Sequence, residues 1–133
     1  MEIIKLWFEN DKIFIETKDN KILWQSLLRY RRLMYATNEE RNNYYTSFSG
    51  IHWSDVDEDM SFESFTYNDK EPDGISKLFL SYPELNASAV ARRLGMKQSL
   101  LAAYINGTKK PSQKRESEIK EAVRQIGMEL INI

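Results

Sequence analysis

Residues 86–115 read NASAVARRLGMKQSLLAAYINGTKKPSQKR, and this stretch decides the fold of the C-terminal half. Apolar side chains recur at intervals of three and four residues on both sides of Gly95, which predicts two short helices. Gly95 lies where a tight turn needs a positive φ, and Gly107 lies where a helix usually ends in a left-handed residue. Ala91 is small, as two helices that cross at close range require. The stretch therefore predicts two helices joined by a tight turn.

The charged side chains of this stretch all have one sign. It contains Arg92, Arg93, Lys97, Lys109, Lys110, Lys114 and Arg115, and no Asp or Glu. The solvated face of an ordinary domain normally mixes both signs of charge, so this pattern favours a polyanionic partner. Helices with this spacing and charge are typical of a DNA-binding helix-turn-helix.

Charge also divides the whole chain of 133 residues, whose net charge is −1. Residues 86–133 carry nine basic and four acidic side chains, and residues 1–85 carry ten basic and sixteen acidic ones. The halves therefore have net charges of +5 and −6, which suggests two modules with different partners. The absence of cysteine excludes a disulfide framework and a thiolate site. We see no signal peptide and no run long enough to span a membrane, and we expect a soluble cytoplasmic protein.

The N-terminal half begins with three short apolar runs separated by turn residues. Residues 3–8, 13–17 and 22–24 are predicted to be strands. Strands so close in sequence most simply form an antiparallel meander. The aromatic side chains of this half are expected in its core; they are Trp7, Phe8, Phe14, Trp24, Tyr30, Phe48 and Trp53.

A helical pattern follows the third strand. Ser26 is the expected N-cap of a helix that ends near Tyr35, and Thr37 with Glu40 forms a capping box for a second short helix. Residues 45–53 return to a strand pattern, in which Gly50 would mark a bulge or a bend. An acidic loop and one helical turn at residues 61–65 complete the half.

His52 and the acidic loop at residues 55–59 are two features that could indicate an enzyme. A general base is most often histidine, but a single histidine beside Trp53 is more often structural, and no nucleophile is evident beside it. Residues 55–59 could hold a hard cation, but they lack the glycine and distal glutamate of a calcium loop. A solvated turn is the simpler interpretation. We therefore predict no enzymatic activity, no catalytic residues, no metal site and no cofactor.

Motifs in the N-terminal half resemble a family of small bacterial modules known only as a domain of unknown function. The motifs are Ala36-Thr37, Glu39-Glu40-Arg41, Gly50-Ile51-His52-Trp53 and Asp57-Glu58-Asp59-Met60-Ser61, and the resemblance covers about residues 1–65. Ser54 replaces the proline that members typically carry after the tryptophan. The family is similar to partners in two-gene toxin–antitoxin pairs, and some members carry a C-terminal helix-turn-helix. The resemblance therefore implies a protein partner for this half, such as a toxin.

Residues 68–74 are polar and rich in turn formers, and four helices are expected after this linker. The first spans about residues 75–82, and Asn86 and Ser112 would cap the second and the fourth. The fourth would end near Gly127. The apolar tail 128–133 would not stay exposed: it would cover the core, pair as a strand or join a dimer contact, and the sequence leaves these alternatives open.

The helical half, over about residues 75–126, resembles the phage-repressor type of helix-turn-helix. The residues that carry the resemblance are Ala91, Leu94, Gly95, Met96, Gln98, Ser99, Ala103, Asn106 and Gly107. It implies that Lys97, Gln98 and Ser99, at the start of the third helix, read base edges. Further DNA contacts are expected from Tyr104, Asn106, Lys109, Lys110, Lys114 and Arg115. Ala87 departs from the family, whose members often carry a longer polar residue there; alanine cannot reach a phosphate or brace Gln98.

Together these patterns predict an α+β protein with a sheet-containing module at residues 1–67, a linker at 68–74 and a helix-turn-helix module at 75–133. The expected function is sequence-specific transcriptional regulation, in the form of an antitoxin that represses its own operon. The expected partners are double-stranded DNA, a toxin and a second copy of the chain, with no membrane. The alternative is a protein-interaction adaptor that does not bind DNA.

Overall fold

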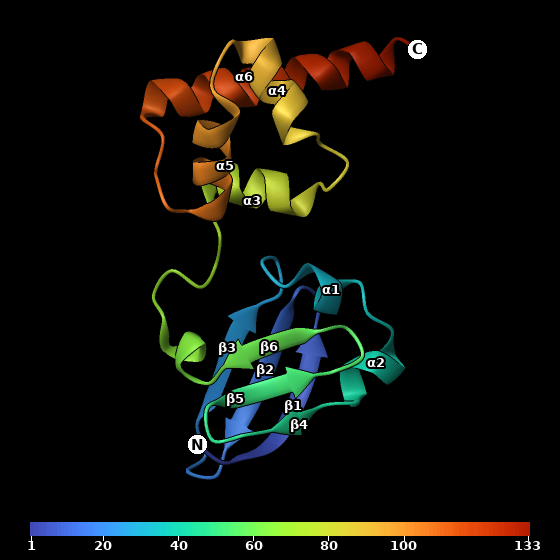
Figure 1. The fold of residues 1–133 in the computed structure, drawn as a ribbon, viewed down its shortest axis with the longest axis vertical. Coiled ribbons are helices and arrows are strands. Elements are labelled where there is room, and N and C mark those ends of the chain that lie inside the picture. The colour runs from blue at the N-terminus through green and yellow to red at the C-terminus, as the bar shows by residue number, and fades with distance from the viewer. The chain divides into compact units, whose positions relative to one another are not determined.

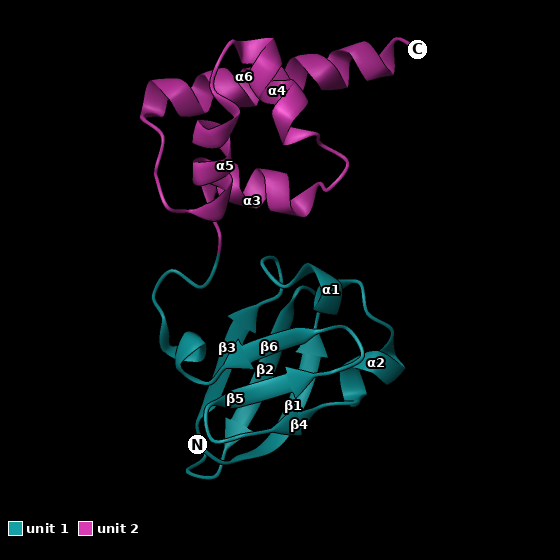
Figure 2. Ribbon diagram, viewed as in Figure 1, with its two compact units in different colours: residues 1–71 teal, residues 72–133 magenta.

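The computed structural model describes residues 1–133 and divides them into two units, Met1–Glu71 and Pro72–Ile133. Figure 2 shows the two units in different colours. The division falls inside residues 68–74, where the sequence places the linker. The fold is α+β, because unit 1 contains all the strands and unit 2 is helical.

Unit 1 begins with a three-stranded antiparallel meander, as the sequence predicts. Its strands are β1 (Ile3–Glu9), β2 (Lys12–Thr17) and β3 (Ile22–Ser26), in the order β1-β2-β3. Asn10 and Asn20 have positive φ in the two connecting turns, a conformation that asparagine adopts more readily than most residues. Ile13 and Ile15 alternate with outward residues along β2 and are fully buried.

A second antiparallel sheet, with the order β4-β5-β6, is formed by β4 (Tyr45–Thr46), β5 (Gly50–Trp53) and β6 (Glu58–Ser61). Side chains from both sheets meet in one core, and the drawing shows the sheets lying one over the other (Figure 1). The buried residues of this core are Ile13, Ile15, Leu27, Leu33, Ile51, Trp53, Met60, Phe62 and Phe65. Gly50 allows a close approach of β5 and β6, since a Cβ there would overlap the carbonyl oxygen of Met60, and the β5–β6 register runs without a shift at this residue.

The helix predicted from Ser26 to about Tyr35 is wrong in its first half. Ser26 is the last residue of β3, and its hydroxyl oxygen accepts a hydrogen bond from the Leu28 amide in the following turn. Only α1 (Arg31–Met34) is helical. Leu27 and Leu28 are buried in an irregular segment, so tertiary burial overrides their helix propensity.

The capping box is confirmed at α2 (Asn38–Asn42), where the Thr37 hydroxyl oxygen accepts from the Glu40 amide and the Glu40 carboxylate accepts from the Thr37 amide. The helical turn expected near residues 61–65 is the 3-10 helix η1 (Glu63–Thr66).

The aromatic residues expected in the core fall into three groups. Trp53 is buried, and Phe8 and Tyr30 pack against the core. Phe48 is 97% exposed, so its prediction is wrong. The remaining three residues are partly buried and lie outside the core, so the prediction is wrong for them as well; they are Trp7, Phe14 and Trp24. They lie opposite one another on β1, β2 and β3, and the rings of Trp7 and Phe14 stack with their centroids 5.5 Å apart.

Unit 2 consists of four helices: α3 (Gly74–Ser81), α4 (Ala87–Leu94), α5 (Gln98–Asn106) and α6 (Gln113–Ile131). Its buried core contains Ile75, Phe79, Val90, Ala91, Leu101 and Ile119. The two predicted N-caps are confirmed, because the Asn86 side chain accepts from the Ala89 amide and the Ser112 hydroxyl oxygen accepts from the Arg115 amide.

Helix α6 does not end at Gly127, as the sequence had suggested, but continues to Ile131. A glycine inside a helix costs only about 1 kcal/mol, which is too little to stop it. The expectation that the tail is covered is also wrong within one chain: Met128, Leu130, Ile131 and Ile133 are 57%, 59%, 78% and 100% exposed. The tail neither covers the core nor pairs as a strand. None of the six α-helices combines the length and the apolar character needed to cross a membrane.

Candidate nucleic-acid interface

The turn between α4 and α5 depends on a left-handed glycine. Gly95 has φ 67° and ends α4, and the Met96 amide donates to the carbonyl of Ala91 at 3.0 Å. This is the pattern of a left-handed helix C-cap, which satisfies carbonyls at the helix end. Ala91 is fully buried, so α4 carries a side chain small enough for close packing at this point. The predicted turn is therefore present.

The three residues that are predicted to read bases lie at the start of α5 and are exposed to solvent. Lys97 is the N-cap of α5 without a side-chain cap, and Lys97, Gln98 and Ser99 are all exposed. Leu101, one turn further along, is fully buried in the unit 2 core and fixes which side of α5 faces inward. Tyr104, from which a DNA contact is also predicted, is partly buried and packs against the core.

The loop after α5 holds the next predicted contacts in a defined conformation. Gly107 has φ 80° and caps α5, and the Thr108 hydroxyl and the Lys109 amide both donate to the carbonyl of Ala103, at 3.2 and 3.3 Å. Asn106, Lys109 and Lys110 are exposed on this segment. The loop therefore presents two lysines between the end of α5 and the cap of α6.

Not all the basic residues of the stretch are available to a partner. Lys97, Lys109, Lys110 and Lys114 are exposed, and none forms a salt bridge. Arg93, however, pairs with Glu129 at 2.5 Å, and Arg115 pairs with Glu118 at 3.5 Å. Carboxylates from α6 thus pair with two arginines of a stretch that has no carboxylate of its own. The Arg115–Glu118 pair has i,i+3 spacing on one helix and could have been read from the sequence, whereas only helix packing brings Glu129 to Arg93.

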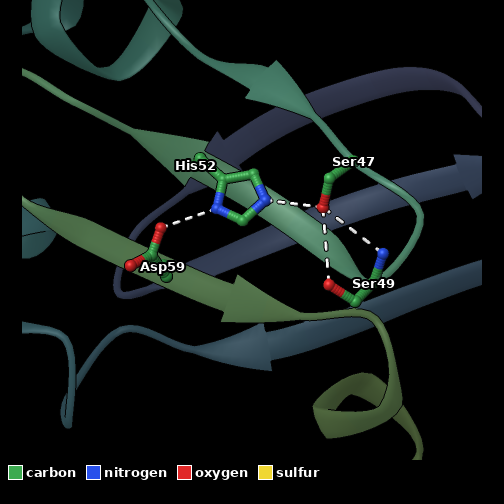
Figure 3. Close-up of polar contacts among 4 residues, drawn as sticks. All are labelled: Ser47, Ser49, His52 and Asp59. Carbon is green, nitrogen blue, oxygen red and sulfur yellow. Dashed lines mark hydrogen bonds and ion pairs between the residues drawn. The ribbon is translucent and has the colours of Figure 1, made fainter.

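A second polar cluster lies in unit 1 around His52 (Figure 3). The Nε2 atom of His52 lies 2.6 Å from the Ser47 Oγ atom, and its Nδ1 atom lies 2.6 Å from the Asp59 Oδ1 atom. The expectation that no nucleophile stands beside His52 is wrong. Ser47 is five residues away in a polar loop, and only the pairing of β4 with β5 brings it to the imidazole.

The carboxylates of the acidic loop, residues 55–59, contact different partners. Asp55 accepts from the Asn43 side chain at 2.8 Å, and Asp57 pairs with Arg32 at 3.2 Å. Burial raises the pKa of the Glu58 carboxyl above its usual range, with the nearby Arg32 guanidinium opposing the shift. No three acidic, histidine or cysteine side chains converge on a point where a metal ion would fit.

A family model described as "Protein of unknown function (DUF2442)" matches residues 3–71. The chain belongs to this family. The match ends at the last residue of unit 1 and confirms the resemblance of the N-terminal half to a domain of unknown function. The helices of unit 2 lie outside the matched residues. No curated protein and no solved structure matches the chain.

Proposed function

We propose that this DUF2442 protein is a sequence-specific DNA-binding transcriptional regulator in which α4 and α5 form a helix-turn-helix. The observation that carries the proposal is the start of α5, where three polar side chains are exposed directly after a glycine-capped turn. A helix presented in this way suits the major groove of B-DNA, which is wide enough to admit one α-helix.

The side chains at the start of α5 have the chemistry of base readout. Gln98 can form a bidentate pair with adenine, Ser99 can bond to either type of base, and Lys97 favours guanine. The exposed lysines after α5 supply positive charge for the phosphates: Lys109 and Lys110 lie in the loop, and Lys114 lies in the first turn of α6. Phosphate contacts of this kind position a protein on the duplex, whereas base contacts give the specificity.

The exposed end of α6 supports a homodimer. Ile119, Val123 and Ile126 pack into the core, and the same spacing continues to Leu130, which is exposed, as are Met128 and Ile131 in the last turns of the helix. Alternating intervals of three and four are those of a helix–helix seam. A second copy would cover these side chains and provide a second recognition helix, as two half-sites on DNA require.

Unit 1 is assigned to a protein partner. Residues 1–71 carry nine basic and fourteen acidic side chains, a net charge of −5, which repels DNA and leaves this unit free for another contact. The resemblance of its motifs to partners in toxin–antitoxin pairs favours a toxin, and a cytoplasmic antitoxin that represses its own operon is the form of the proposal that joins both units.

The proposal is tested by selecting duplexes from a random library with the full-length protein and measuring affinity by fluorescence anisotropy. Gln98→Ala should change the preference at one base pair and cost roughly 1–3 kcal/mol at that site. Lys109→Ala should weaken binding to all duplexes alike. Lys77→Ala, which removes an exposed charge from α3, serves as the matched control. If Gln98→Ala and Lys109→Ala leave every duplex affinity unchanged, α5 is not a recognition helix.

A protein-interaction adaptor is the second candidate, because the exposed apolar end of α6 is also a surface that another protein could cover. Salt dependence separates the two. Four exposed lysines would each neutralise one phosphate and contribute about −0.9 to the slope of the logarithm of the binding constant against the logarithm of the salt concentration. The slope is then about −3.6 for each copy of the chain, which is a loss of affinity of about 150-fold between 50 and 200 mM salt. Binding through apolar contacts would change little over this range.

A further inference from the structure

The cluster around His52 is held on three strands of the second sheet of unit 1. His52 on β5 is directly opposite Tyr45 on β4 and directly opposite Asp59 on β6. The Tyr45 ring stacks on the imidazole with a centroid distance of 4.8 Å. On the other side of β5, Ile51 and Trp53 are anchored in the core. The imidazole therefore has a fixed position and a fixed ring orientation before any ligand arrives.

The hydrogen bonds define which nitrogen of a neutral His52 carries the proton. A carboxylate only accepts hydrogen bonds, so the contact of 2.6 Å to Asp59 requires the proton on Nδ1. The Nε2 atom then has a free lone pair and accepts from the Ser47 hydroxyl, also at 2.6 Å (Figure 3). The Ser47 oxygen also accepts from the Ser49 amide at 3.3 Å and lies 3.4 Å from the Ser49 hydroxyl oxygen. The contact with His52 Nε2 is the shorter of the two that the Ser47 proton can make.

We propose that Ser47 is an activated nucleophile, with His52 as its general base and Asp59 as the positioning residue, and that it takes acyl groups from carboxylic esters. The order of contacts, hydroxyl to imidazole to carboxylate, is the one that activates serine in unrelated acyl-transfer enzymes, where it is recognised by geometry rather than by sequence position. This inference concerns unit 1 and does not depend on DNA binding.

The step transfers one acyl group and one proton. The Ser47 oxygen forms a bond to the ester carbonyl carbon while His52 Nε2 takes the hydroxyl proton. The tetrahedral intermediate then collapses, the bond from the carbonyl carbon to the alkoxy oxygen breaks, and the leaving alcohol receives the proton from Nε2. The products are one molecule of alcohol and Ser47 carrying the acyl group as an ester, with His52 neutral again.

The surroundings of Ser47 indicate the class of ester. Ser47 is exposed, and its neighbour Phe48 is 97% exposed. Tyr45, which stacks on the imidazole, is 59% exposed. Two exposed aromatic side chains in the same hairpin as the hydroxyl favour an ester with an apolar or aromatic group, because rings that contact the ester would lose contact with water when it binds.

The test uses p-nitrophenyl acetate with the full-length protein, and follows acetylation of individual serines by digestion and mass spectrometry. Ser47 should be acetylated faster than Ser49 and Ser54, two exposed serines that serve as internal references in the same digest. His52→Gln and Asp59→Asn should each slow the acetylation of Ser47 by at least roughly 100-fold. Asp59→Glu keeps a carboxylate and should recover part of the rate.

Ser54→Ala is the matched control, since it removes an exposed hydroxyl from the same unit at a residue that has no hydrogen bond to Ser47. It should leave the acetylation of Ser47 unchanged. The proposal is overturned if Ser47 in the wild-type protein reacts no faster than Ser49 and Ser54. It is also overturned if His52→Gln, folded as judged by its unfolding midpoint, reacts at the wild-type rate. The first comparison needs no variant, so it decides the matter even if a substitution prevents folding.

Discussion

Replacing Gly95 with alanine should destabilise unit 2 through the backbone alone. Gly95 has φ 67°, and an L-residue in this conformation costs roughly 1–2 kcal/mol because its Cβ approaches the following carbonyl oxygen. A Cβ built on Gly95 has no other heavy atom within 4 Å, so no packing clash is added. Alanine also restricts the unfolded chain, which offsets about 0.4–1 kcal/mol. The expected net loss in the free energy of unfolding is about 1 kcal/mol.

Gly127 provides a matched control in the same unit. It lies inside α6 with helical backbone, and a Cβ there also has no heavy atom within 4 Å. Alanine is favoured over glycine in a helix interior by about 1 kcal/mol, so Gly127→Ala should stabilise the unit. The two variants make the same chemical change in the same open surroundings, and they differ only in the backbone conformation. A loss of stability in Gly95→Ala and a gain in Gly127→Ala would show that the backbone conformation causes the effect.

The assay is thermal unfolding of the full-length protein followed by circular dichroism at 222 nm. In a domain of this size, 1 kcal/mol shifts the midpoint by roughly 4–8 °C. We therefore expect Gly95→Ala to lower the midpoint of the helical transition by about that amount and Gly127→Ala to raise it. A Gly95→Ala protein as stable as the wild type would show that the turn does not require the left-handed conformation.

Three further substitutions test the two cores and one carboxylate. Leu101→Ala removes a fully buried side chain from unit 2 and should cost roughly 2–5 kcal/mol in urea unfolding monitored by circular dichroism; a loss below 1 kcal/mol would contradict the packing. Gly50→Ala places a Cβ against the backbone carbonyl of Met60 and should cost about 1–3 kcal/mol, read from tryptophan fluorescence because all three tryptophans lie in unit 1; an unchanged midpoint would refute the close approach. Glu58 has a raised pKa in the folded protein, so its ionised form opposes folding above that pKa, and the opposition disappears below the pKa of the unfolded chain. Glu58→Gln should therefore raise the thermal midpoint at neutral pH, with a gain that shrinks towards about pH 4; a gain independent of pH would contradict the assigned cause.

Sequence patterns predicted the elements whose signals are local. The three strands of the meander, the capping box at Thr37 and the caps at Asn86 and Ser112 are all present. The predicted helix from Ser26 failed because burial of Leu27 and Leu28 outweighs a propensity of a few tenths of a kcal/mol. A capping side chain or a positive φ acts within about four residues, so sequence alone can identify it.

The candidate sites likewise combine features that the sequence predicts with features that depend on the tertiary structure. The exposure of Gln98 beside the buried Leu101 follows from helical periodicity, which is readable in the sequence. The Ser47–His52–Asp59 arrangement depends on the register of three strands, and a slip of one residue would turn His52 to the other face of its sheet.

The amino-acid sequence by itself determined where the chain turns, where its helices are capped and how its charge is divided between two halves. Only the tertiary structure decided that Ser47 meets His52, that Glu129 reaches Arg93, and that α6 continues past Gly127 with an exposed apolar end. The reason is physical. Caps and glycine torsions depend on neighbouring residues, whereas strand register and helix packing depend on contacts between residues far apart in the chain, which periodicity does not encode.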